Sequence, residues 1–540
     1  MVSTRTVICF FQVVTFTFSH ADKRFSATDS TGVRMKYLLG SALLVVSSFS
    51  FAGEPAPVVD TEAGKVQGYR TDEGISVYKG IPYAANPFTT ERRFQAPQPM
   101  QPWQGIKKTV SDSPVPQPGR TPAQPLVGQA GDLTLNIWRP YDVKGKMPVM
   151  VWIPGGAWIR EDATEPVYDG SVFAKKGVMV VTVNYRVGVD GFMHFAHRPD
   201  NRGIADQIAA LKWVQRNITK FGGDPSRVTL FGQSAGAGSV AIHLGNPATK
   251  GLYQQAILQS PPMQWVSPAD ATRITQQFAH NLNISADPEA VAKVPFDVLV
   301  QNVLKVGDQI KDAAQWGRLS LGGTAFLPVA DNKIIVRSPM EDLANNDSNR
   351  VPVIVGSTDS ESRLYLVPNG GLQKITDKDV STVIHDLRLP SGALQSYTKN
   401  SINAESAGDI YAQIMSDYTF RMPALNIANI MSGNQKTWFY NFSWRSPAYN
   451  GRLGAAHFVD VPFTFGTIQT KEAENFVGVN PPVSLSESIN NAWVSFAKYG
   501  NPGWPHYSDK DKKIMMFNTK SGVATSLDPQ ITSLWEKFRY

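Results

Sequence analysis

The stretch Val228-Thr229-Leu230-Phe231-Gly232-Gln233-Ser234-Ala235-Gly236 decides how this chain folds. Its apolar first half is typical of a buried strand, and the small residues that follow it indicate a closely packed helix. Gly232 and Gly236 leave room for a sharp turn between the two, because a Cβ at either position would crowd the backbone. We therefore predict a strand–turn–helix that exposes the Ser234 hydroxyl at a helix N-terminus, where negative charge is favoured.

A serine hydroxyl becomes a useful nucleophile only with a base and with an acid that orients the base. In this type of turn the expected chain order is serine, acid, histidine, which leaves His385, His457 and His506 as candidates. We favour His457, because the small residues Gly454–Ala456 before it leave the imidazole free to approach the serine. His385 lies in an amphipathic helix pattern and His506 in a Trp- and Pro-rich tail, and we interpret both as structural.

The acid is expected just after a core strand. The run Val351-Pro352-Val353-Ile354-Val355-Gly356 has the pattern of a buried parallel strand. Two carboxylates, Asp359 and Glu361, follow it. Either could accept a hydrogen bond from the second imidazole nitrogen, so spacing alone leaves both open; Asp359 could equally cap a solvated turn.

Donors for a developing oxyanion are expected in a glycine-rich loop after an earlier strand. Met147–Ile153 reads as that strand, and Pro154-Gly155-Gly156-Ala157-Trp158 follows it. Residues without large side chains let backbone N–H groups turn toward one point. The N–H of Ala235, directly after the serine, would add a further donor.

With these motifs, the chain resembles the type B carboxylesterases, the cholinesterase-like branch of the α/β-hydrolases. The matching segments extend from Tyr78-Lys79-Gly80-Ile81-Pro82 to Gly500-Asn501-Pro502. The strongest lies between Asn201 and Gly236 and includes Asp206-Gln207 and Phe221-Gly222-Gly223-Asp224-Pro225. The resemblance implies an α/β-hydrolase fold, with a mainly parallel central sheet, helices on both faces and helical insertions around the active-site mouth. We expect those insertions between Pro262 and Gln315.

The resemblance also implies roles for particular residues. It selects Glu361 over Asp359 as the acid, supports His457 as the base for Ser234, and indicates Gly156, Ala157 and Ala235 as the oxyanion hole. The chain departs from the family pattern in four places. Pro154 stands where the family has His or Tyr, Ala157 where it has glycine, and Gln233 where it usually has Glu. Gly131-Asp132-Leu133 replaces a family segment that contains cysteine. None removes a member of the proposed triad, but the first two bear on substrate range.

Composition limits the other function classes. The 540 residues are 42% hydrophobic, enough for a large core, and show no repeat or linker that would divide them. No metal-binding or nucleotide-binding motif is present, so we expect no metal and no cofactor. The net charge of +7 is too dispersed to indicate nucleic acid but suits an anionic substrate, which Arg160 and Arg363 could contact near the active-site mouth. The simpler interpretation of each arginine is a solvated side chain in a loop.

The N-terminus bears on location. Met35-Lys36-Tyr37 opens an apolar run that is too short to span a bilayer and ends at Ser50-Phe51-Ala52, which predicts a signal peptide over 35–52. Residues 1–34 read as an overextended start or upstream leader, and 53–540 as a single esterase domain. The only cysteine, Cys9, precedes this domain, so we expect a bacterial-type enzyme without disulfides, exported to the periplasm or secreted.

Two function classes remain open at this point. The first is a secreted serine hydrolase acting on a small-molecule carboxylic ester, whether selective or of broad specificity, with amide or lactone hydrolysis as the nearest variant. The second is a non-catalytic, cholinesterase-like binding protein. The presence of Ser234, Glu361 and His457 together favours the enzyme.

Overall fold

The computed structural model describes residues 54–538, apart from 122–123, 143, 161, 346–347, 401–404 and 434. The predicted leader and signal peptide lie outside the described residues. Among the described helices, none has both the length and the apolar character needed to cross a lipid bilayer.

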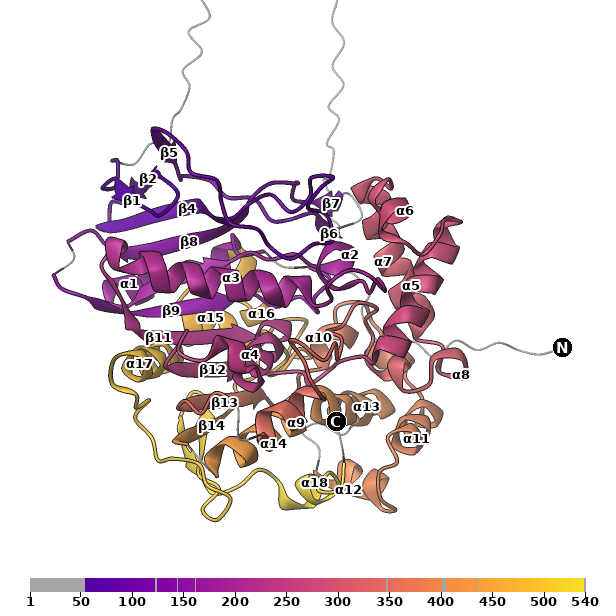
Figure 1. Ribbon diagram of the computed structural model, residues 1–540. Helices are drawn as coiled ribbons and strands as arrows, with labels where there is room; N and C mark the ends of the chain where they lie inside the picture. Colours follow the sequence, from indigo (N-terminus) through magenta and orange to yellow (C-terminus); the bar gives the residue numbers. More distant parts are fainter. Residues whose placement is uncertain are drawn as a thin grey trace, which may run out of the picture.

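A large twisted sheet forms the centre of the molecule, and it confirms the mainly parallel sheet expected from the sequence (Figure 1). From edge to edge its strands are β16 (Gly522–Ala524), β15 (Ile514–Phe517), β14 (Thr437–Phe442), β13 (Val353–Thr358), β12 (Gln255–Gln259), β11 (Gly223–Gln233), β9 (Met147–Ile153), β10 (Met179–Val183), β8 (Leu133–Pro140), β4 (Ile75–Ala84) and β3 (Tyr69–Arg70). The strands from β15 to β10 run parallel, whereas β16, β8, β4 and β3 pair antiparallel. β11 and β13 therefore end at the same edge, where ligands bind in open sheets of this kind.

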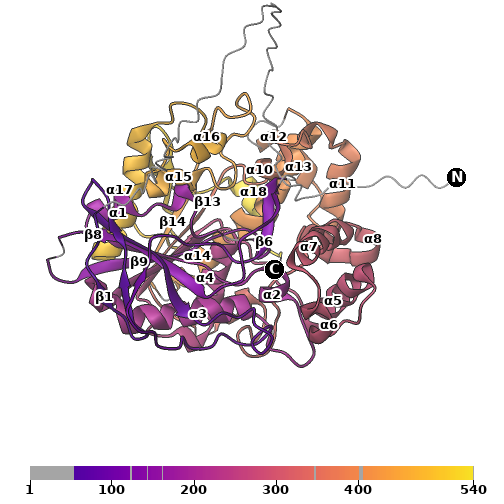
Figure 2. The same ribbon diagram turned by 90° about the horizontal axis from the view of Figure 1, so that it is seen from above.

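Helices cover both faces of the sheet, as predicted. α3 (Arg202–Asn217), α4 (Ala235–Gly245) and α14 (Met422–Ser432) pack on one face, and α1 (Ser171–Lys175), α15 (Asp460–Phe465) and α17 (Val483–Tyr499) on the other (Figure 2). Side chains alternate along β9, so that Val149 and Val151 enter the first core and Met150 and Trp152 the second. Both faces are buried, which explains why the parallel strands read as continuous apolar runs.

A helical cover follows β12, where the sequence placed the insertion. It consists of α5 (Pro268–Leu282), α6 (Pro288–Ala292), α7 (Phe296–Ile310) and α8 (Ala313–Trp316), which lie beside one end of the sheet (Figures 1 and 2). A second helical segment follows β13 and contains α10 (Arg363–Leu366), α11 (Asp377–Asp386), α12 (Ala393–Asn400), α13 (Ala407–Ser416) and the π-helix η6 (Asp417–Arg421).

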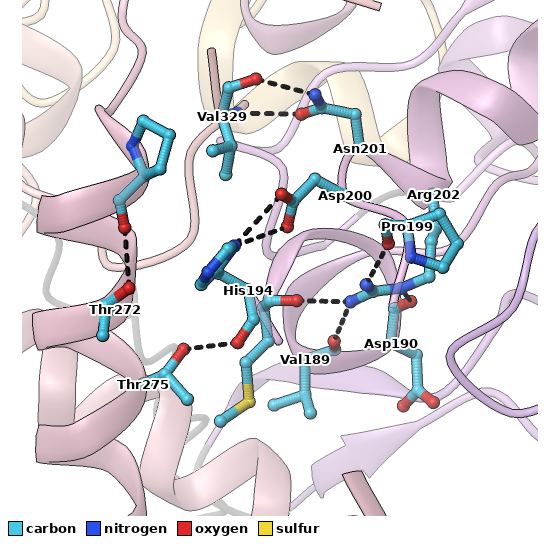
Figure 3. Close-up of polar contacts among 12 residues, drawn as sticks. Val189, Asp190, His194, Pro199, Asp200, Asn201, Arg202, Thr272, Thr275 and Val329 are labelled. Carbon is cyan, nitrogen blue, oxygen red and sulfur yellow. Dashed lines mark hydrogen bonds and ion pairs between the residues drawn. The ribbon is translucent and has the colours of Figure 1, made fainter. Parts of the chain in front are cut away.

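Polar contacts hold the loop before α3, and one of them joins it to α5, whose Thr275 hydroxyl donates to the oxygen of His194 at 2.8 Å (Figure 3). The guanidinium of Arg202 donates to the main-chain oxygens of Asp190, Pro199, Val189 and Met193 at 2.6–3.1 Å. Asn201 donates from Nδ2 to the oxygen of Val329 at 2.7 Å and accepts from its N–H at 2.8 Å. The Asn201–Val329 pair joins segments 128 residues apart.

Candidate active site

Ser234 occupies the predicted turn between β11 and α4. Its φ of 57° and ψ of −131° are unusual for a residue with a Cβ, so the turn is strained. The strain persists because the flanking glycines let the turn press against the end of β9: a Cβ on Gly236 would lie 2.0 Å from the oxygen of Ile153. The Ser234 side chain borders a narrow cavity of about 20 Å³, lined also by Ala157, Pro262 and Tyr365.

The glycine-rich loop after β9 lies directly against this serine. A Cβ on Gly155 would be 3.0 Å from Cβ of Ser234, so only glycine fits there. Gly156, Ala157 and Trp158 all have positive φ, 124°, 56° and 56°, which coils the loop back on itself. Ala235 begins α4, so its N–H has no partner within the helix. The loop that contains Gly156 and Ala157 and the N-terminus of α4 at Ala235 thus both lie beside Ser234, which is the arrangement expected of an oxyanion hole.

Of the two candidate carboxylates, Glu361 is the one placed against His457. Its Oε2 lies 2.5 Å from His457 Nδ1. Its Oε1 accepts hydrogen bonds from the Thr358 N–H at 2.7 Å and from Ser260 Oγ at 2.6 Å. The carboxylate is fully buried and accepts hydrogen bonds at both oxygens, so its position is well held.

Asp359 lies two residues earlier but turns elsewhere. Its Oδ1 accepts a hydrogen bond from Asn441 Nδ2 at 2.6 Å. Burial raises its pKa, an effect that the nearby Arg421 guanidinium opposes. Asp359 is therefore a buried structural carboxyl beside the site, neither the solvated turn cap nor the partner of the imidazole.

His457 is the downstream histidine that the fold brings to this point. Its ring lies 4.3 Å from the Phe420 ring and 5.8 Å from the Tyr365 ring, between centroids. His385 is instead on α11 with a side chain 88% exposed, and His506 packs edge-on against Trp438. Both fit the structural interpretation given to them from sequence.

A second buried carboxyl, Asp460, stands three residues after His457. Its Oδ2 accepts from Gln259 Nε2 at 2.9 Å and from the Tyr440 hydroxyl at 3.1 Å. Burial, reinforced by repulsion from Glu361, raises the pKa of Asp460 to about 6. The site thus contains two adjacent acids, of which Glu361 contacts the imidazole.

The two arginines differ in their surroundings. Arg363 is nearly buried; its Nη1 pairs with Asp409 at 2.6 Å and its Nε donates to the oxygen of Arg452 at 2.6 Å. Arg160 is partly exposed, and its Cγ and main-chain oxygen lie close to Gly156 in the glycine-rich loop. The structure therefore places Arg160 next to the glycine-rich loop and ties Arg363 into an ion pair. Within the described residues, no group of three or more acidic, histidine or cysteine side chains is arranged to hold a metal ion.

Comparison with known proteins agrees with this geometry. Residues 55–535 match the model of the carboxylesterase family. The chain belongs to that family. It is 34% identical over 498 residues to the para-nitrobenzyl esterase of Bacillus subtilis, covering 88% of this chain and 96% of the relative. It is 28% identical to the fumonisin B1 esterase of Sphingopyxis macrogoltabida, and the match covers 92% of this chain and 93% of that relative. A crystal structure of a Geobacillus stearothermophilus carboxylesterase superposes with a TM-score of 0.78 at 31% identity, covering 89% of this chain and all of that one.

The protein is therefore a carboxylic ester hydrolase with an α/β-hydrolase fold. Several residues around its site were not singled out from sequence. Tyr365 lies four positions after Glu361, and its hydroxyl is a hydrogen-bond partner of the Ser234 side chain. Its position about one turn after Glu361 could have indicated that Glu361 and Tyr365 lie close together, because the chain coils tightly between Ser360 and Tyr365. Ser260 gave no comparable signal, because it reaches Glu361 only through the register of β12 and β13.

Proposed function

We propose that this carboxylesterase works through an acyl-enzyme, with Ser234 as nucleophile, His457 as general base and acid, and Glu361 as the group that orients the imidazole. Ser234 Oγ attacks the ester carbonyl while Nε2 of His457 takes its proton. The N–H groups of Gly156, Ala157 and Ala235 stabilise the oxyanion. The alcohol leaves with the proton from His457, and water releases the acid by the same steps in reverse. The observation that carries this proposal is the 2.5 Å contact between Glu361 Oε2 and His457 Nδ1, beside a serine in a strained turn.

Ser234→Ala tests the nucleophile. We expect turnover of a simple aryl ester to fall by about 10⁶-fold and labelling by a fluorophosphonate probe to disappear. Ser226→Ala, at an exposed position near the start of β11, is the matched control and should retain both. A folded Ser234→Ala protein that keeps more than a few per cent of activity would refute the assignment. A wild-type protein that neither turns over esters nor takes the label would instead favour the binding-protein alternative.

The surroundings of the nucleophile have room for a bulky ester. A hollow of about 330 Å³ adjoins the narrow cavity and shares Gln264, Gly322 and Thr419 with it. Two tryptophans, Trp265 and Trp316, help to line this hollow. A large alcohol or a long acyl chain could extend into it while the ester carbonyl stays at Ser234.

We further propose that the acyl group is anionic, as in esters that release tricarballylate side chains from fumonisin-like polyols. Free carboxylates in a partly dry pocket need a cation, and a guanidinium matches them well. The support is the relative that is a fumonisin B1 esterase and the place of Arg160 next to the glycine-rich loop. A carboxylesterase of broad specificity is the second candidate, favoured by the higher identity to the para-nitrobenzyl esterase.

Two esters of the same alcohol separate these candidates, one of tricarballylate and one of an uncharged acid of similar size. An anionic acyl site predicts a higher kcat/KM for the charged ester and an advantage that added salt reduces. Arg160→Ala should then cost the charged ester about 1–3 kcal/mol and the neutral ester little. Arg363→Ala is the control: losing its pair with Asp409 should lower stability without changing the preference. A wild-type enzyme without preference for the charged ester would leave broad specificity as the function.

We also propose that the enzyme is exported, with cleavage after Ala52 and residues 53–540 as one mature domain. N-terminal sequencing of protein recovered from the periplasm or medium should begin at Gly53. Retention of residues 35–52 on the active enzyme would contradict this.

A further inference from the structure

The glutamine before the nucleophile contacts the catalytic imidazole. Gln233 is the last residue of β11, and the residue is 1% exposed. Its amide nitrogen Nε2 lies 3.0 Å from His457 Nε2 and 3.4 Å from His457 Nδ1. The contact joins residues 224 positions apart.

These two distances show from which side the amide approaches. A donor lying along the in-plane lone pair of His457 Nε2 would be about 5 Å from Nδ1. A position in the ring plane that is nearly equidistant from both nitrogens would collide with Cε1 between them. The Gln233 amide nitrogen therefore lies over a face of the imidazole. The in-plane lone pair of Nε2 stays free to take the proton of Ser234.

An amide nitrogen in this place affects the two forms of the ring differently. It is the positive end of the amide dipole, and the face of a neutral aromatic ring is electron-rich, so the contact suits neutral imidazole. The same positive end repels imidazolium. The other end of the amide lies beside the glycine-rich loop, since a Cβ on Gly155 would be only 3.2 Å from Gln233 Oε1.

The other groups around the ring include both charged and neutral members. Glu361 on the β13–α10 turn contacts Nδ1, and Asp460 on α15 interacts electrostatically with His457. Both carboxylates favour imidazolium when ionised. Two aromatic residues, Tyr365 on α10 and Phe420 on η6, also lie against the His457 ring. Two further groups act through the carboxylates: the Tyr440 hydroxyl on β14 donates to Asp460, and Asp359 interacts electrostatically with Glu361.

We propose that Gln233 is a positioning residue that holds the face of His457 and favours its neutral, proton-accepting form against the carboxylates behind it. The inference rests on the proposed role of His457 as general base. It explains what a neutral amide does at the position where the family pattern has a carboxylate. The consequence is an esterase whose activity extends to lower pH than it would with glutamate at this position.

The pH dependence of kcat/KM for an uncharged aryl ester tests this, because the substrate itself does not titrate. We expect Gln233→Glu to move the acid-side midpoint upward by about 1–2 pH units, the size of shift that a contacting opposite charge produces. Gln233→Met keeps the volume but removes the dipole and should move the midpoint upward by less. Gln301→Glu, on an exposed position of α7, adds the same charge far from the site and should not move it.

The outcomes separate this inference from the proposed function. If Gln233→Glu and Gln233→Met both keep the wild-type midpoint while activity still requires Ser234, Gln233 has only a packing role and the inference is wrong. If Gln233→Glu fails to fold, Gln233→Met decides: an upward shift supports the inference and an unchanged midpoint overturns it. Activity that survives Ser234→Ala would instead overturn the proposed function itself.

Discussion

Replacing Glu361 by glutamine is the substitution for which the structure makes the sharpest prediction. The carboxylate accepts two donors at Oε1, the Thr358 N–H and the Ser260 hydroxyl, and one at Oε2, His457 Nδ1. A glutamine amide has one oxygen and one NH₂ group, so it cannot accept at both ends. Because two donors face the Oε1 position, the amide oxygen is expected there and the NH₂ group toward His457.

That orientation determines the tautomer of the base. An NH₂ group can only donate, so Nδ1 must present its lone pair and the ring proton must move to Nε2. A protonated Nε2 cannot take the proton of Ser234. The amide also lacks the negative charge that stabilises imidazolium in the transition state.

The expected loss is about 10³–10⁴-fold in kcat, which corresponds to about 4–5.5 kcal/mol of transition-state stabilisation. KM should change little, because Glu361 is buried behind the imidazole and does not face the cavity that Ser234 lines. Steady-state kinetics on an aryl ester measure both quantities, and a thermal melt confirms that the variant is folded.

Asp359→Asn is the matched control. It is the same chemical change at a carboxyl two residues away, but Asp359 bonds Asn441 and not the imidazole. We expect kcat to stay within about tenfold of wild type, since no catalytic contact is lost. A larger loss at Asp359 than at Glu361, or equal losses at both, would refute the reasoning.

Two further predictions concern stability. The pKa of Asp460 is about 6 in the folded protein and 3.8 in the unfolded chain. Protonated Asp460 therefore favours the folded state, and its contribution of about 3 kcal/mol is fully present below pH 3.8 and is lost as the pH rises through 6. Asp460→Asn should therefore flatten the dependence of the urea midpoint on pH between 4 and 7, and an unchanged slope would contradict this. Asn201→Ala removes both hydrogen bonds to Val329 and puts alanine at a φ of 52°, so we expect the unfolding free energy to fall by about 3 kcal/mol. A melting temperature equal to that of the wild type would show that other contacts hold the loop before α3.

The local parts of this site were predictable from the sequence. The turn at Ser234 and the loop from Pro154 to Trp158 depend on glycines next to apolar strands, and steric exclusion acts on neighbours in the chain. The strand over Met147–Ile153 also has the predicted bounds, and α5–α8 lie, to within one residue, in the insertion that the family resemblance implied. The parallel sheet followed from the continuous apolar runs, since only strands buried on both faces tolerate them.

The choice between the two carboxylates needed either a family resemblance or the fold. Asp359 and Glu361 are alike in charge and spacing. What separates them is which one faces a histidine about a hundred residues later, and that depends on how the turn after β13 leaves the sheet.

The partners of Arg363 and Gln233 were decided by tertiary structure alone. Arg363 pairs with Asp409 on α13, and Gln233 lies over His457, through contacts spanning 46 and 224 residues. Sequence patterns record the preferences of a residue and its near neighbours, whereas the electrostatic environment of a buried group is set by every element packed around it. The sequence therefore indicated which residues could carry out ester hydrolysis, and the fold decided which of them meet and which polar and charged groups surround them.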